Sequence, residues 1–256
     1  MAKMRSIRSG LVVCLASLSM AFVPQPAHAI PTLQLGIDGG SYDSSTQTIF
    51  SPGSSFALYA FLIPNSSNTI GDTYYLSMPV TPQVSAAASL GSFTYNGNTV
   101  NVTSDMTYGT PPIDAYSAAY DPGDLAKHSI FPTYFKEVGF SFSGSQSGQS
   151  ARFNTQEQPS SGPQSGSGMY YKLFNIDTSN LGSGYEIHFD LYNTKLCTKD
   201  KGSCAGATDT DITQFAPFSH DAQSFTTPIP EPEIYVMMGL GLGLIGWVGR
   251  RRKPAA

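Results

Sequence analysis

Polar and apolar residues alternate along 184–192, the stretch GYEIHFDLY. Every second position is apolar or aromatic, and acidic residues and a histidine lie between them: Tyr185, Ile187, Phe189 and Leu191 against Glu186, His188 and Asp190. Because successive side chains of a strand point to opposite faces, this period of two predicts a strand with one buried face. The other face, which carries His188, is expected to meet solvent.

A second local signal is Asn96-Gly97, which lies between β-prone arms in 92–103. The commonest two-residue hairpin turns need positive φ at their central residues, and Asn-Gly meets that need, so we expect a hairpin here. Turns separate further expected strands at 32–37, 56–63, 73–78, 137–142 and 169–176, and 113–120 favours a short helix. Many short strands at this spacing predict an all-β protein, a β-sandwich of jelly-roll-like type.

One segment interrupts this pattern. Twenty of the 26 residues of 143–168 are Ser, Gly, Gln or Pro, a composition that does not supply a hydrophobic core. A linker between two domains is one interpretation. We favour a long mobile loop inside one sandwich domain that spans 30–228, because the 60-odd residues after it contain few expected strands.

The two ends of the chain have a different character. Residues 1–29 begin with three cations, continue with the apolar run 11–22 and end in Ala27-His28-Ala29. This is the pattern of a secretory signal peptide, removed by signal peptidase between Ala29 and Ile30. An uncleaved membrane helix is the alternative, but a 12-residue apolar core is short for spanning a bilayer.

Near the other end, the apolar run 234–248 is followed by four cations, Arg250, Arg251, Arg252 and Lys253. As a helix its 15 residues would be about 22 Å long, against about 30 Å for a bilayer core, so we expect a short transmembrane helix. The cations would stay on the cytoplasmic side and fix its direction. A buried helix is the alternative, but consecutive cations do not suit its end.

The motif Pro230-Glu231-Pro232, the apolar run and the basic end make 229–256 resemble the PEP-CTERM sorting signal. That resemblance implies a Gram-negative bacterium that makes extracellular polysaccharide. It also implies processing at Pro230–Pro232 by an exosortase, a membrane protease, after transient anchoring in the inner membrane. The stretches TLQLGIDGGSYD and VTSDMTYGTPPID are similar to the choice-of-anchor surface proteins, which are largely of unknown function.

Without its two ends the chain carries seven Lys and Arg against 16 Asp and Glu, a formal charge of −9. Such a body is not expected to bind nucleic acid, although it could bind divalent cations. Cys197 and Cys204 are expected to form a disulfide in an oxidising compartment. A metal site at this pair is the weaker alternative, because its spacing matches no zinc pattern.

Candidate chemistry is sparse. The sequence has no serine-hydrolase elbow, H-E-x-x-H motif or phosphate loop. Glu186 and Asp190 could act as a carboxylate pair in glycoside hydrolysis, but a solvated strand face carries the same residues. Asp209, Asp211 and Asp221 are candidate calcium ligands, with solvated turn aspartates as the alternative. Tyrosines in 73–75 and 169–172 could stack on sugar rings or fill the core.

These patterns together favour an exported, non-enzymatic cell-surface or extracellular-matrix protein, associated with extracellular polysaccharide. No cofactor is expected, apart from possible calcium. One alternative is a carbohydrate-binding adhesin module, and a polysaccharide-active enzyme is another.

Overall fold

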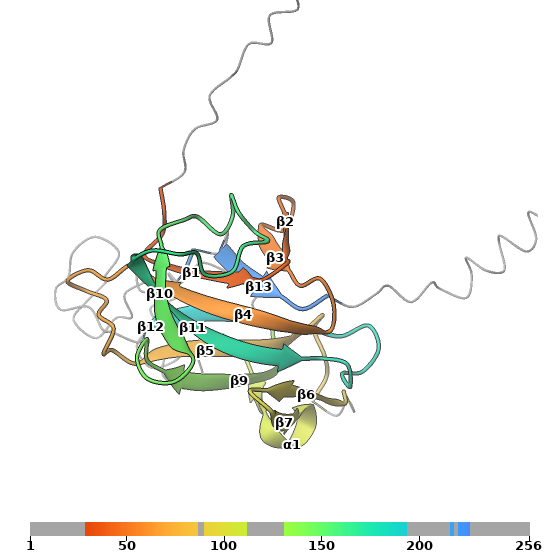
Figure 1. The fold of residues 1–256 in the computed structure, drawn as a ribbon. Coiled ribbons are helices and arrows are strands. Elements are labelled where there is room, and N and C mark those ends of the chain that lie inside the picture. Colours follow the sequence, from red (N-terminus) through yellow and green to blue (C-terminus); the bar gives the residue numbers. More distant parts are fainter. Residues whose placement is uncertain (1–28, 87–89, 112–130, 194–215, 218–219, 226–256) are drawn as a thin grey trace, which may run out of the picture.

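Two β-sheets packed face to face form the body of the protein in a computed structural model (Figure 1). The structure describes residues 29–86, 90–111, 131–193, 216–217 and 220–225. It contains thirteen strands and one short helix, α1 (Val102–Asp105), within these residues. The expectation of an all-β body with two sheets is confirmed.

The first sheet has six strands. Its main path runs β1 (Leu33–Ile37), β4 (Ser55–Leu62), β11 (Gly168–Asp177), β6 (Ser92–Tyr95) and β7 (Asn98–Asn101), and β10 (Ser147–Ala151) also pairs with β11. Neighbouring strands are antiparallel throughout.

The second sheet has seven strands. Its order is β2 (Ser41–Asp43), β3 (Thr48–Phe50), β13 (Asp221–Gln223), β12 (Glu186–Asn193), β5 (Tyr74–Thr81), β9 (Thr133–Phe140) and β8 (Thr107–Gly109). Strand β13 lies parallel to β3, and the other described pairs are antiparallel. The last described strand therefore joins two parts of the chain that are far apart in sequence.

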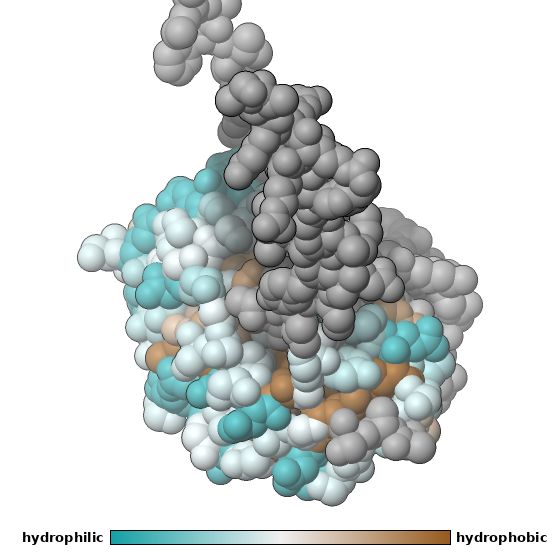
Figure 2. All heavy atoms as spheres, turned by 90° about the vertical axis from the view of Figure 1, so that its right-hand side faces the viewer, coloured by the Kyte–Doolittle hydropathy of each residue, from teal (hydrophilic) through white to brown (hydrophobic). Residues whose placement is uncertain are grey.

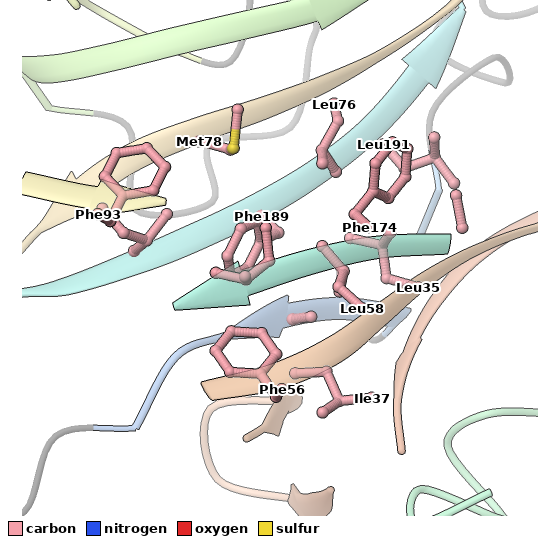
Figure 3. Close-up of a cluster of buried hydrophobic side chains, with 14 of the residues drawn as sticks. Leu35, Ile37, Phe56, Leu58, Leu76, Met78, Phe93, Phe174, Phe189 and Leu191 are labelled. Atoms are coloured by element: carbon pink, nitrogen blue, oxygen red, sulfur yellow. The ribbon is translucent and has the colours of Figure 1, made fainter. Parts of the chain in front are cut away.

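The core lies between the two sheets and is rich in phenylalanine and leucine (Figure 3). Alternate residues of each strand point into it, as the period-two pattern predicts. In β12 these are Ile187, Phe189 and Leu191, each no more than 1% exposed. From the opposite sheet, Phe56 meets Phe189 edge to face, with ring centroids 6.0 Å apart. Burial of this surface is the main stabilising term of the fold.

The predicted hairpin is confirmed. Strands β6 and β7 pair from Ser92 opposite Asn101 to Tyr95 opposite Asn98. Asn96 and Gly97 occupy the turn with φ of 49° and 79°, the positive values that a type I′ turn requires. The expected strands at 32–37, 56–63, 73–78, 137–142 and 169–176 all overlap observed strands.

Segment 143–168 differs from the expected mobile loop. It contains strand β10, and it buries Phe153, which packs with Phe61 and Met169 on the outer face of the six-stranded sheet. Buried Gln34 holds the segment in place, because its amide donates to the Phe153 carbonyl (2.9 Å) and accepts from the Thr155 amide (3.0 Å). Composition misled here because backbone pairing and one buried polar network do not need many apolar side chains.

Several predicted features lie outside the described residues. These are the signal peptide up to residue 28, the helix at 113–120, both cysteines of the expected disulfide, and the C-terminal apolar run. Ala29 and Ile30, which flank the predicted cleavage point, are both exposed. No helix in the described part of the chain is long and apolar enough to cross a membrane. On the face in Figure 2, hydrophilic and neutral residues surround limited hydrophobic areas.

Candidate functional site

The outer face of the seven-stranded sheet carries a cluster of one histidine and two carboxylates. His188 and Asp190 lie two residues apart on β12, so their side chains share a face. Strand β13 pairs with β12 with His188 opposite Gln223 and Phe189 opposite Ala222. The same register brings Asp221 beside Asp190. The sheet thus joins residues that are more than 30 positions apart in sequence.

Distances within this cluster are short. His188 Nε2 lies 3.4 Å from Asp190 Oδ1 and 3.3 Å from Asp221 Oδ2. The side chains of His188, Asp190 and Asp221 are 9%, 13% and 3% exposed. The expectation of a solvent-facing His188 was therefore wrong. Alternation reports which residues share a face, but it does not report whether that face is covered.

A polar chain orients the imidazole. Gln223 donates its side-chain amide to Glu186, so its Oε1 remains as an acceptor. His188 Nδ1 lies 3.2 Å from this oxygen. The hydrogen-bond network therefore assigns the Nδ1 hydrogen to the bond with Gln223 and turns Nε2 toward the two aspartates.

The electrostatics favour a cation between the carboxylates. Burial lowers the pKa of His188. The charge and hydrogen bond of Asp190, together with those of Asp221, raise this pKa by more than burial lowers it. The net result is a pKa of His188 well above its ordinary value. With Nδ1–H committed to Gln223, a lone pair on Nε2 would face two negative groups. The arrangement is favourable when Nε2 carries a proton or meets a metal ion.

The structure separates the predicted site residues into groups. It joins Asp190 to His188 and Asp221, and it connects Glu186 to them through Gln223. Asp209 and Asp211, the other candidate calcium ligands, lie outside the described residues, as do Pro230–Pro232 and the basic residues at 250–253. The role of Gln223 carried no sequence signal, because β13 has only three residues.

The other described histidine is part of a structural contact. His220 is 4% exposed, and its Nε2 lies 2.9 Å from Asn154 Oδ1. This contact connects the residue before β13 to segment 143–168. The remaining histidine of the body, His128, lies outside the described residues.

The tyrosines proposed for sugar stacking have different surroundings. Tyr74 is fully buried and packs edge to face on Phe142, so its expected alternative role in the core is confirmed. Tyr75 is half-buried and stacks on Tyr192, with ring centroids 5.7 Å apart. On the opposite sheet, half-buried Tyr171 meets Tyr59 edge to face at 5.8 Å.

Fold and site define an all-β protein of two sheets with a histidine–carboxylate cluster on one outer face. Residues 228–253 match the family model of the PEP-CTERM protein-sorting motif. This motif implies export, transient membrane anchoring and processing by an exosortase-type membrane protease. No curated protein and no solved structure matches the chain.

Proposed function

We propose that this protein is a non-enzymatic surface or matrix protein that acts in the extracellular polysaccharide of a Gram-negative bacterium. The observation that carries the proposal is the sorting motif at 228–253, which follows the two-sheet body directly. The net negative body suits an extracellular role and disfavours nucleic-acid partners. A jelly-roll-like topology and membership of the choice-of-anchor type belong to the same proposal.

The candidate carboxylate pair supports a structural role over catalysis. Glu186 accepts a hydrogen bond from Gln223, and Asp190 faces the His188 imidazole. General acid–base catalysis needs carboxylates that can reach the substrate and exchange protons with it. The purified wild-type protein is expected to show no hydrolysis of the native polysaccharide. Loss of a measured hydrolytic activity in Glu186→Gln or Asp190→Asn would overturn the non-enzymatic assignment.

Cell fractionation tests the proposed location. The wild-type protein is expected in the matrix fraction, with an intact mass that begins near Ile30 and ends near Pro230–Pro232. A variant with Pro230, Glu231 and Pro232 replaced by alanine is expected to stay in the membrane fraction with its C-terminal segment uncleaved. Glu233→Ala is the matched control, because it removes an acid next to the Pro230–Pro232 tripeptide and leaves the tripeptide itself unchanged. Recovery of the wild type only from the cytoplasm or the membrane would contradict the proposal.

Carbohydrate binding is a second candidate function. Tyr59 and Tyr171 lie half-buried on the outer face of the six-stranded sheet, and Tyr59 stacks on Phe61 at 5.9 Å. Partly exposed tyrosine rings suit stacking on sugar rings. Titration with the purified polysaccharide is expected to show binding that Tyr171→Ala weakens and Tyr95→Phe, on the inner face, preserves. No binding at millimolar sugar would exclude this function.

A further inference from the structure

We propose that His188, Asp190 and Asp221 bind a divalent transition-metal ion of the zinc type. Each residue offers one ligand atom, and the three atoms all lie within 4.8 Å of one another. This inference goes beyond the proposed function, because a matrix protein need not bind such an ion.

Ligand spacing supports the choice of a small ion. In tetrahedral coordination with bonds of about 2.0–2.1 Å, neighbouring ligand atoms are about 3.3–3.4 Å apart. His188 Nε2 lies 3.4 Å from Asp190 Oδ1 and 3.3 Å from Asp221 Oδ2, so two edges of such a site are already in place. The two strands fix these spacings through their register, and a small rotation of the carboxylates adjusts the third edge.

The surroundings of His188 fit a metal ligand. A ligating histidine usually donates its other ring N–H to a neighbouring acceptor, which fixes the tautomer and the ring orientation. Gln223 Oε1 is the acceptor for the Nδ1–H of His188, and Glu186 accepts a hydrogen bond from the Gln223 amide. The Nε2 lone pair is thereby presented to the point where both carboxylates converge.

Ser77 provides a further polar group on the same face. It lies directly opposite Asp190 in the pairing of β5 with β12. Ser77 is 0% exposed, and its hydroxyl has no hydrogen-bond partner within the described part of the chain. A buried hydroxyl without a partner is unusual, and a water bound to the metal in its fourth position would give it one.

The ligand set disfavours calcium. Calcium takes six to eight oxygen ligands at 2.3–2.6 Å, whereas this cluster presents an imidazole nitrogen and two carboxylates. Zinc and its neighbours accept imidazole and carboxylate together. The structure thus brings one of the three candidate calcium ligands, Asp221, into a site of different chemistry.

Zinc titration of the purified, chelator-treated protein tests this site. Calorimetry is expected to show one zinc ion bound per chain and a raised melting temperature. His188→Gln and Asp221→Asn are expected to weaken binding at least 10-fold. His220→Gln is the matched control, since it changes another buried histidine, and it should bind zinc as the wild type does. Equal affinity in the wild type and in His188→Gln would overturn the proposal.

Two further arms locate the ion and its class. A Cys197→Ser, Cys204→Ser double variant is expected to keep zinc affinity, and loss of binding there would overturn the proposed location. Calcium at the same concentration is expected neither to displace zinc nor to raise the melting temperature, and displacement would overturn the metal class. A cobalt titration uses the wild-type protein alone, so its result does not depend on whether a variant folds. The cobalt spectrum should show tetrahedral d–d bands without a thiolate charge-transfer band, and the absence of these d–d bands would contradict the site.

Discussion

Gly91 lies where the turn before β6 meets the loop after β11, and it offers a sharp test of backbone packing. Its φ is +76°, and it forms an isolated bridge with Leu181. Two backbone hydrogen bonds flank it: the Ser92 amide donates to Asn180 (3.0 Å), and the Gly182 amide donates to Leu90 (2.7 Å). A side chain at this position would have to enter the space between the two segments.

The expected cost of Gly91→Ala has two parts. A left-handed backbone costs a residue with a side chain about 1–2 kcal/mol. In addition, the new Cβ would lie 2.3 Å from the Asn180 carbonyl oxygen and 3.0 Å from the Gly182 nitrogen. Relief of this overlap separates the segments and weakens both hydrogen bonds, at about 0.5–1.5 kcal/mol each. The total loss of unfolding free energy is therefore about 2–5 kcal/mol.

Gly97→Ala isolates the backbone part. Gly97 has nearly the same φ, +79°, but a Cβ there would meet no atom within 4 Å. Urea unfolding followed by far-ultraviolet circular dichroism should show that Gly91→Ala is less stable than Gly97→Ala by about 2 kcal/mol, with equal m-values. This difference corresponds to about 4–8 °C in melting temperature. Equal losses in the two variants would refute the steric argument.

Three further predictions concern buried side chains, and urea unfolding tests each of them. Gln34→Leu should lower the free energy of unfolding by about 2–3 kcal/mol, because it leaves the buried Phe153 carbonyl and the buried Thr155 amide without their partner. Exposed Gln149→Leu should change it by no more than about 0.5 kcal/mol, and similar values for both variants would count against the buried network. Phe174→Ala should cost about 3–5 kcal/mol and half-buried Leu173→Ala clearly less, and the reverse order would exclude the assigned faces. Tyr192→Phe removes a buried hydroxyl that donates to a carboxylate on β9, so a loss of about 1–3 kcal/mol is expected, and unchanged stability would show that this bond contributes nothing.

Local sequence signals predicted the parts of the fold that depend on local geometry. Alternation in 184–192 indicated which residues of β12 enter the core, because side-chain direction in a strand follows from backbone geometry alone. Asn96-Gly97 indicated its hairpin because few other residue pairs adopt positive φ at low cost. Neither signal requires knowledge of the rest of the chain.

In contrast, the burial of an outer sheet face and the pairing of distant strands depend on residues far apart in the sequence. His188 is buried although it lies on the outer face of its sheet, and no pattern within β12 reports that burial. Strand β13 pairs in parallel with β3, whose residues lie more than 170 positions earlier. A three-residue strand with such a partner has almost no periodicity to detect. The convergence of Asp190 and Asp221 on His188 was therefore beyond prediction from sequence, although each aspartate was a candidate for a different role.

The cluster also bears on the point where the chain leaves the sheet. Strand β13 ends at Gln223, and the sorting motif begins at residue 228, so few residues separate them. Backbone pairing over three residues holds a strand weakly. The contacts of His188 with Asp221 and Gln223 attach β13 to β12 through side chains as well, in a buried setting where such contacts are strong. A substitution of His188 should therefore weaken the attachment of β13 to β12 and leave the sorting motif unchanged. The stability of the body and the sorting of the chain can thus be separated by experiment.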